Sequence, residues 1–221
     1  MNFYIDFDNT LYNTKALTTD MLSSLAKYIS EAKGENEEKI LSHLKSKFNR
    51  KNIYNIFSLC EYFAVKYNMD VNELQLIIKQ ILENGDKYVY EDVPEFLECL
   101  KKDNKLTILT AAAGKDNIDY QELKVCGSGI TKYFNNIMIT AESKDELNLN
   151  YSNGIFIDDN PNDLMKLYNA GAKTVIRIRR PEAKYSEHEL GNLYNSYIQE
   201  YNSLSEIECK YKNRNESEQC K

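Results

Sequence analysis

Two short apolar runs in the sequence each end in closely spaced aspartates. The carboxylates concerned are Asp6, Asp8, Asp158, Asp159 and Asp163. Ligands of parallel α/β sheets bind where the carboxyl ends of the strands converge, so we expect these side chains to lie at one edge of a sheet. So many carboxylates would repel one another in a low-dielectric cleft unless a hard cation lay among them. An all-oxygen ligand set suits Mg²⁺, and the sequence therefore predicts a magnesium site.

Two threonines and a lysine are the other candidate site residues, because they also stand near strand ends. Thr10 belongs to the first aspartate run, Thr110 ends the apolar run LTILT, and Lys144 follows the run NNIMIT. An isolated threonine is most often an ordinary N-cap or turn residue. A lysine usually lies on a solvated face, and Lys115 and Lys132 in nearby loops compete with Lys144 for a role in the site.

Apolar runs typical of buried strands alternate with helical segments over much of the chain. The strand-like runs lie at 3–7, 105–110, 135–140, 154–158 and 173–178. Helices are expected between them, at 94–102, 116–125 and 161–170. The alternation indicates right-handed βαβ units, and the expected fold class is α/β with a parallel, Rossmann-like sheet.

A long helical segment interrupts this pattern directly after the first strand. Thr18, Thr19 and Asp20 are candidate N-caps for a helix that runs to about Ala32. Amphipathic stretches with helical periodicity follow it. Four antiparallel helices in this segment would form a small bundle.

The sequence therefore divides into three expected parts. The α/β core comprises residues 1–12 and 90–180, and the helical insert comprises residues 13–89. Residues 181–221 form the third part, with one C-terminal helix expected within 187–207 and a polar tail after it.

The composition excludes several classes of protein. Asp and Glu number 34 against 28 Lys and Arg, and the resulting net charge of −6 argues against a nucleic-acid-binding surface. No apolar stretch approaches the ~18–20 residues of a membrane span, and the N-terminal MNFYIDFDNT lacks the basic region of a signal peptide. The five cysteines are scattered and form no CxxC pair, which disfavours a disulfide framework or a zinc site. We expect a cytoplasmic protein.

Four motifs in order along the chain resemble those of the haloacid dehalogenase-like (HAD) superfamily of Asp-dependent phosphohydrolases. They are FYIDFDNTL, the strand end LTILT, the lysine in ESK, and the acidic segment FIDDNPND. The resemblance extends from residue 1 to about residue 179. It implies that the insert at 13–89 is a helical cap, which closes over the catalytic face and selects the leaving group.

The resemblance also implies a role for each residue of the motifs. Asp6 would attack phosphorus and form an aspartyl-phosphate, and Asp8 would be the general acid and base of the two steps. Thr10, Thr110 and Lys144 would bind the phosphate group. Lys144 would also reduce the repulsion between Asp6 and the incoming phosphate.

The metal ligands implied by the resemblance come from both acidic motifs. Asp6 and the backbone carbonyl of Asp8 would bind Mg²⁺ from the first motif. Asp159 would be the direct ligand from the second motif. Asp163 would hold Asp159 or a metal-bound water, and Asp158 would support them.

Two stretches depart from the family pattern. Only 14 residues lead from Lys144 to Asp158, which is too short for the helix that many relatives place there. Thr110 is followed by Ala-Ala-Ala-Gly, where relatives often carry Asn or another polar residue. This second difference would reshape phosphate binding or loosen contacts with the substrate.

The favoured function is Mg²⁺-dependent hydrolysis of a small phosphorylated metabolite, with no nucleic-acid or membrane partner. A metal-free haloacid dehalogenase shares the fold and the nucleophile, but it needs neither Asp8 nor the pair Asp158 and Asp159. A non-catalytic binding module on the same fold would not be expected to retain the full carboxylate set. The sequence leaves open the substrate, the choice between phosphatase and phosphomutase, and the oligomeric state.

Overall fold

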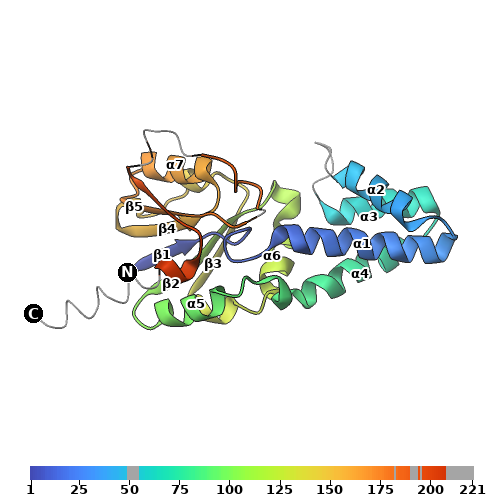
Figure 1. Cartoon of the computed structure of the whole chain (residues 1–221), viewed down its shortest axis with the longest axis horizontal. Helices are drawn as coiled ribbons and strands as arrows, with labels where there is room; N and C mark the ends of the chain where they lie inside the picture. The colour runs from blue at the N-terminus through green and yellow to red at the C-terminus, as the bar shows by residue number, and fades with distance from the viewer. Residues whose placement is uncertain (49–54, 182, 190–193, 195, 208–221) are drawn as a thin grey trace, which may run out of the picture. The chain divides into compact units, whose positions relative to one another are not determined.

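The chain forms two compact units (Figure 1). The computed structural model describes residues 1–48, 55–181, 183–189, 194 and 196–207. The first unit comprises Met1–Asn13, Val89–Ala112 and Ile130–Lys221, and the second comprises Thr14–Tyr88 and Ala113–Gly129. The chain therefore leaves the first unit shortly after its first strand and returns to it twice.

The first unit is built on a six-stranded sheet whose neighbouring strands are all parallel. The strands are β1 (Asn2–Ile5), β2 (Lys105–Ala111), β3 (Asn136–Thr140), β4 (Gly154–Asp158), β5 (Thr174–Ile178) and β6 (Ile198–Tyr201). Their order is β3-β2-β1-β4-β5-β6, so the sheet has a topological switch point between β1 and β4. The predicted α/β class with a parallel sheet is confirmed.

Helices cover both faces of this sheet. They are α5 (Val93–Lys101) and α7 (Pro161–Asn169), with one-turn helices η3 (Thr131–Tyr133), η4 (Lys144–Glu146) and η5 (Tyr151–Asn153). Figure 1 shows α5 and α7 on opposite sides of the sheet. All five residues of β4 are buried, as expected of a parallel strand covered on both faces. The core around α7 consists of Leu109, Phe156, Leu164, Leu167, Ala172, Val175 and Ile198.

The second unit is helical. Its members are α1 (Thr14–Lys33), α2 (Glu37–Phe48), α3 (Ile56–Tyr67), α4 (Val71–Glu83), η1 (Gly85–Tyr88), η2 (Lys115–Asn117) and α6 (Ile118–Gly127). Helix α1 packs against α2 and α4, and α3 packs against α4. The first helix begins at Thr14, before the predicted N-caps, and Asp20 instead accepts hydrogen bonds from Tyr88 and Lys87. Of the helices described, none is long and apolar enough to cross a membrane.

Residues 113–129, which the sequence analysis assigns to the core, group with the helical unit. Within this unit, α6 packs against α4. The approach is so close at Gly127 that a Cβ atom there would lie 1.7 Å from the carbonyl oxygen of Leu82. A glycine therefore permits a backbone contact that any side chain would prevent. Such a contact leaves no hydrophobic pattern in the sequence.

A helix was predicted at 187–207. This prediction is wrong for residues 198–201, which form β6. This strand pairs in parallel with β5 and extends the sheet by one strand. Ile198 is buried in the core of the first unit. Four residues are too few for an alternating strand pattern to be told apart from helical periodicity. The polar tail predicted at 209–221 lies outside the described residues.

Candidate active site

The chain turns sharply after β1, and this turn carries the first two aspartates of the site. The backbone N–H of Asp6 donates to the carbonyl of Ile157 at 2.8 Å, so the pairing with β4 extends one residue beyond β1. The N–H of Tyr12 donates to the carbonyl of Phe7 at 3.1 Å and closes the turn. Asn9 has a φ of 57°, a left-handed conformation that asparagine tolerates better than most residues. The turn holds Asp6 at the carboxyl edge of the sheet.

Lys144 lies between two aspartates at this edge. Its Nζ atom donates to Asp6 Oδ1 and to Asp158 Oδ2, at 2.6 Å in each case. The exposed fractions of the side chains are only 4% for Lys144, 8% for Asp6 and 3% for Asp158. Asp159 completes the group, since carboxylate oxygens of the three aspartates lie within 4.8 Å of one another. The Lys144 ammonium therefore forms ion pairs with two of the three buried carboxylates of this group.

Neither of the two lysines that compete with Lys144 in the sequence is buried. Lys132 is exposed, and its Nζ atom lies 5.2 Å from the centre of the Tyr133 ring. Lys115 is exposed and belongs to the second unit. The structure thus brings Lys144, as predicted, to the aspartates at the sheet edge.

A connection without an α-helix carries Lys144 from β3 to β4. The one-turn helices η4 and η5 occupy it, which agrees with its short length. The Tyr151 hydroxyl lies 2.9 Å from the carbonyl oxygen of Lys144 and 2.5 Å from that of Leu147, so it donates to the turn that carries the lysine. Its ring stacks on Phe156 of β4. Sequence reasoning missed Tyr151, because nothing distinguishes it among 17 tyrosines.

Asn160 organises the second acidic motif and was also missed. Its backbone N–H donates to Asp158 Oδ1 and its side-chain amide donates to Asp163 Oδ2, at 2.8 Å in each case. Its Oδ1 atom accepts a hydrogen bond from the N–H of Asn162 and caps α7, which begins at Pro161. The Asn-Pro pair before a helix was the available signal. Asp163 is held by this amide and lies outside the group of three carboxylates.

The remaining predicted residues differ in their surroundings. Asp8 is half-buried, and its charge contributes to raising the pKa values of both Asp6 and Asp159. Thr10 is fully buried, and its Oγ1 atom has no hydrogen-bond partner within the described part of the chain. Thr110 is buried near the carboxyl end of β2.

Burial and mutual repulsion raise the pKa values of the clustered carboxyls. Burial raises the pKa of Asp6 to about 8, although the Lys144 ammonium opposes this change. Burial, followed by the charges of Asp158 and Asp6, raises the pKa of Asp159 to about 9. Burial disfavours the charged form of Lys144, yet Asp158 and Asp6 together raise its pKa above the ordinary value. While no cation is bound, these raised pKa values favour the protonated forms of Asp6 and Asp159 near neutral pH.

The three carboxylates suit a divalent cation. Asp159 Oδ2 is buried without a hydrogen-bond partner among the residues that the structure describes, so this oxygen is available as a ligand. Asp6 and Asp158 each contribute one carboxylate oxygen to the same group. A site composed of oxygen donors fits Mg²⁺, and a cation there would offset the repulsion that raises the pKa values.

The stability of the metal-free protein is expected to fall as the pH rises from about 6 to about 9. The pKa values of Asp6 and Asp159 are raised from 3.8, so the folded chain binds more protons than the unfolded chain in this range. Each increase in pH therefore favours unfolding. Melting temperatures measured by circular dichroism in EDTA test this dependence, and excess Mg²⁺ should raise the melting temperature most at the highest pH.

An Asp159→Asn variant provides the matched comparison, because it removes one titrating carboxyl without changing its size. Its melting temperature in EDTA should depend less on pH than that of the wild type. Asp145→Asn, next to the site lysine but outside the cluster, should keep the wild-type dependence. A metal-free melting temperature that rises over this range would contradict the protonated cluster.

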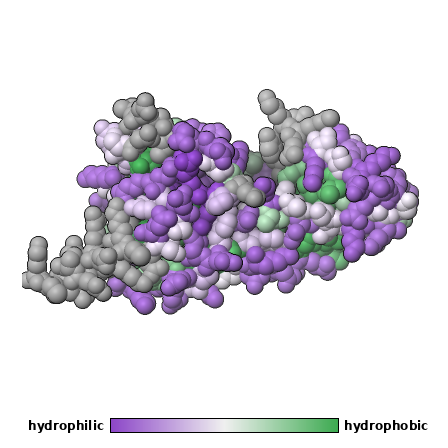
Figure 2. All heavy atoms as spheres, viewed as in Figure 1, coloured by the Kyte–Doolittle hydropathy of each residue, from purple (hydrophilic) through white to green (hydrophobic). Residues whose placement is uncertain are grey.

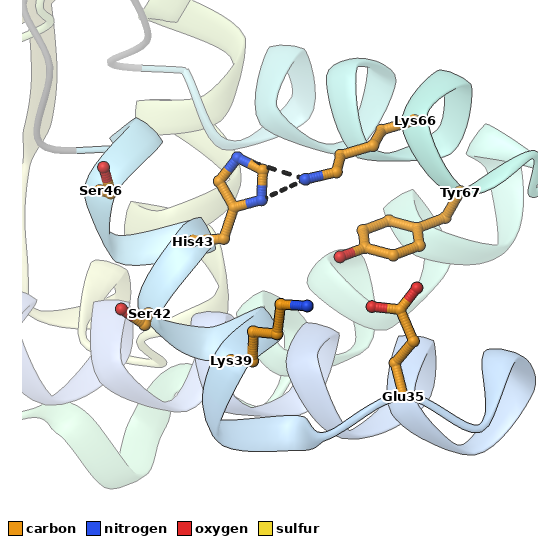
Figure 3. A pocket seen from close by; sticks show the side chains of 7 residues that line it. All are labelled: Glu35, Lys39, Ser42, His43, Ser46, Lys66 and Tyr67. Atoms are coloured by element: carbon orange, nitrogen blue, oxygen red, sulfur yellow. Dashed lines mark hydrogen bonds between the residues drawn. The ribbon is translucent and has the colours of Figure 1, made fainter.

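The second unit contains a separate cavity of about 550 Å³ (Figure 3). Its lining is polar and consists of Glu35, Lys39, Ser42, His43, Ser46, Lys66 and Tyr67. Figure 3 shows the Lys66 ammonium directed at the His43 ring, with which it makes a short contact. None of the predicted site residues lines this cavity, so it is not the candidate active site.

A parallel sheet with buried aspartates and a lysine at its carboxyl edge is the arrangement expected of an Asp-dependent α/β hydrolase. The family model for haloacid dehalogenase-like hydrolases matches residues 4–177. The chain therefore belongs to the haloacid dehalogenase-like hydrolase family, as its motifs predicted. No curated protein sequence matches the chain.

Solved structures of proteins with different described activities share this fold. An HAD phosphatase from Thermococcus onnurineus is 18% identical with a TM-score of 0.61, over 93% of this chain and 95% of that one. A magnesium-bound protein from Bacillus subtilis, described as an HAD hydrolase, is 17% identical with a TM-score of 0.53. The match covers 93% of this chain and 96% of that one. An L-2-haloacid dehalogenase from Xanthobacter autotrophicus is 15% identical with a TM-score of 0.53, over 96% and 98%. At such identities these similarities show the fold alone.

Proposed function

We propose that the protein is a Mg²⁺-dependent hydrolase of small phosphomonoesters that acts through an aspartyl-phosphate intermediate. The observation that carries this proposal is the contact of the Lys144 ammonium with both Asp6 and Asp158. A phosphate group that approached Asp6 would otherwise meet strong repulsion from the buried carboxylates. Fixed positive charge beside the nucleophile offsets that repulsion and stabilises the charge on the transferred group.

The first aspartates supply the two chemical roles that hydrolysis needs. In the first step a carboxylate oxygen of Asp6 attacks phosphorus, the bond from phosphorus to the ester oxygen breaks, and Asp8 donates a proton to that oxygen. In the second step the Asp8 carboxylate takes a proton from water, whose oxygen attacks phosphorus. The bond between phosphorus and Asp6 then breaks, and inorganic phosphate leaves.

The other site residues bind and orient these groups. The hydroxyls of Thr10 and Thr110 and the ammonium of Lys144 would hold phosphoryl oxygens. The residues that would hold Mg²⁺ are Asp6, Asp8 through its carbonyl, Asp158, Asp159 and Asp163. When bound, Mg²⁺ supplies positive charge that stabilises the negative charge of the phosphoryl group.

We also propose that residues 13–89 act as a cap, with hinges near residues 12–15 and 85–93. The supporting observations are the position of this segment directly after the first motif and its folding as α1–α4 in a separate unit. Cap closure excludes water during phosphorylation and selects the leaving group. A cap of this size favours a small phosphorylated metabolite over a phosphoprotein as the substrate.

A haloacid dehalogenase is the second candidate, because some structural neighbours carry that activity in their names. Cleavage of a carbon–halogen bond expels a halide ion, which needs no proton from Asp8. The dehalogenase reaction also needs no metal ion, so it gives no function to the Asp159 oxygen that has no hydrogen-bond partner among the described residues. These two features favour the phosphatase.

Hydrolysis of p-nitrophenyl phosphate is expected to require Mg²⁺ and to fall by about 10²–10³-fold in EDTA, since metal-ion stabilisation is worth several kcal/mol. The measurement is phosphate release, extended to a panel of phosphorylated metabolites, with halide release from 2-chloropropionate in parallel. Excess Mg²⁺ added after EDTA should restore the rate. Full phosphatase activity in EDTA would exclude the metal-dependent mechanism, and halide release without phosphate release would favour the dehalogenase.

A further inference from the structure

Arg180, two residues beyond β5, is buried in the first unit and binds two separate segments of the chain. Its Nε and Nη2 atoms donate to the carbonyl oxygen of Thr10 at 3.1 and 2.9 Å. Its Nη1 and Nη2 atoms donate to the two carboxylate oxygens of Asp92, at 2.8 Å in each case. The guanidinium also lies 4.1 Å from the centre of the Tyr90 ring. Only 6% of the Arg180 side chain is exposed.

These partners lie where the chain leaves the first unit and where it first returns. Thr10 belongs to the turn that carries Asp6 and Asp8, and Asp92 belongs to the returning segment. The N–H of Tyr90 donates to the carbonyl of Leu11 at 3.1 Å, so the two segments are also joined directly. Arg180 therefore secures the turn of the nucleophile to a neighbouring segment of the same unit.

The contacts match the geometry of a guanidinium. Its planar fork binds the Asp92 carboxylate with two parallel hydrogen bonds and still has N–H groups for the Thr10 carbonyl. Asp92 Oδ2 also accepts a hydrogen bond from the N–H of Leu204, so the C-terminal segment completes the cluster. Without Arg180, the Thr10 carbonyl would lose both of these hydrogen bonds in a buried position.

We propose that Arg180 is a positioning residue for catalysis: it holds the turn at residues 6–12 in the geometry that Asp8 and Thr10 need to act on the substrate. This inference rests on the proposed function. Arg180 acts through the Thr10 carbonyl and Asp92 and has no role as a ligand of phosphate or metal. A displacement of about 1 Å in such a turn lowers the turnover rate by as much as about 10²-fold.

The adjacent Arg179 provides a matched control. It makes a similar number of polar contacts in the same unit, but its partners are Ser186, Glu189 and Glu200, none of which belongs to the turn or to the returning segment. Arg180→Gln, Arg180→Lys and Arg179→Gln are compared with the wild type. All measurements are made well below the melting temperature of each variant.

Two measurements separate positioning from general stability. With p-nitrophenyl phosphate and Mg²⁺, Arg180→Gln is expected to lower kcat by about 10–100-fold with KM changed less than about twofold. Arg180→Lys keeps the charge but loses the fork, so its kcat should be intermediate. Hydrogen exchange of the amides in residues 8–12 and 89–92 should be faster in Arg180→Gln. Arg179→Gln should leave both readouts at wild-type values.

Wild-type kcat and wild-type exchange in Arg180→Gln would overturn the proposal. An equal loss of kcat in Arg179→Gln would also overturn the proposal, because the effect would then arise from the segment after β5 as a whole and not from the contacts of Arg180. A wild-type protein that hydrolyses no phosphomonoester would refute the proposed function. The exchange measurement would still decide in that case whether Arg180 holds the turn.

Discussion

Replacement of Asp6 by Asn is expected to lower the rate of phosphate release by more than about 10⁴-fold, as removal of a covalent nucleophile does elsewhere. The amide has nearly the size of the carboxylate but cannot attack phosphorus. Asp6 is also one of three buried carboxylates, with a pKa raised to about 8. At pH 9 its neutral replacement should therefore raise the melting temperature of the metal-free protein. Lost activity with retained or increased stability identifies a catalytic defect.

Two further variants make the test of the nucleophile specific. Asp8→Asn should form and break down the phosphoenzyme slowly, with turnover reduced by roughly 10²–10⁴-fold if Asp8 is the general acid and base. Asp145→Asn should retain wild-type turnover. The phosphoenzyme is detected as an increase in the mass of acid-quenched protein. An acid-stable phosphoenzyme in Asp6→Asn would place the nucleophile on another residue.

Replacement of Lys144 by Met is expected to impair both catalysis and stability. Turnover should fall by about 10²–10³-fold, the usual effect of removing one stabilising donor from a transition state. The free energy of unfolding in EDTA should fall by about 3–5 kcal/mol, because breaking a buried ion pair leaves uncompensated charge. The loss should be largest at high pH, where the aspartates are ionised. Initial rates and urea unfolding measure the two effects.

Lys166→Met is the matched control for this variant. Lys166 is exposed, and its ammonium donates to Ser143 Oγ, beside the site lysine, at 3.0 Å. Exposed interactions of this kind contribute little to stability, so turnover and unfolding should remain near the wild type. If Lys144→Met behaved like Lys166→Met, the buried lysine would have no part in the reaction.

The sequence by itself determined the strands of the core and the aspartates that follow them. Strands were predicted at 3–7, 105–110, 135–140, 154–158 and 173–178. The strands β1–β5 of the structure overlap these ranges, although β1 ends at Ile5, before the predicted end at residue 7. The carboxyl ends of parallel strands lie at the same edge of the sheet, so polar residues that directly follow these strands are predicted to lie at that edge. For this reason the sequence sufficed to predict that Asp6, Asp158 and Asp159 meet.

Only the tertiary structure decided which lysine joins them. A lysine carries no local mark of burial, so the sequence favoured Lys144 but left Lys115 and Lys132 as competing candidates. The choice depends on the β3–β4 connection, where Tyr151 holds the backbone turn and the ammonium reaches a carboxylate 138 positions away in sequence. Contacts between residues so far apart leave no periodic signal.

The same reason explains the other features that the sequence did not show. The Arg180 contact joins residues 170 positions apart, and α6 joins the helical unit through a backbone approach at Gly127. Strand β6 exists because β5 offers a sheet edge for it to pair with, while its own four residues carry too little pattern to exclude a helix. Local periodicity thus determined the elements and the chemistry at their ends. The tertiary structure decided which residues position the reacting groups. This positioning depends on strand pairing, close packing and buried hydrogen bonds between segments that are distant in sequence, so it requires three-dimensional proximity.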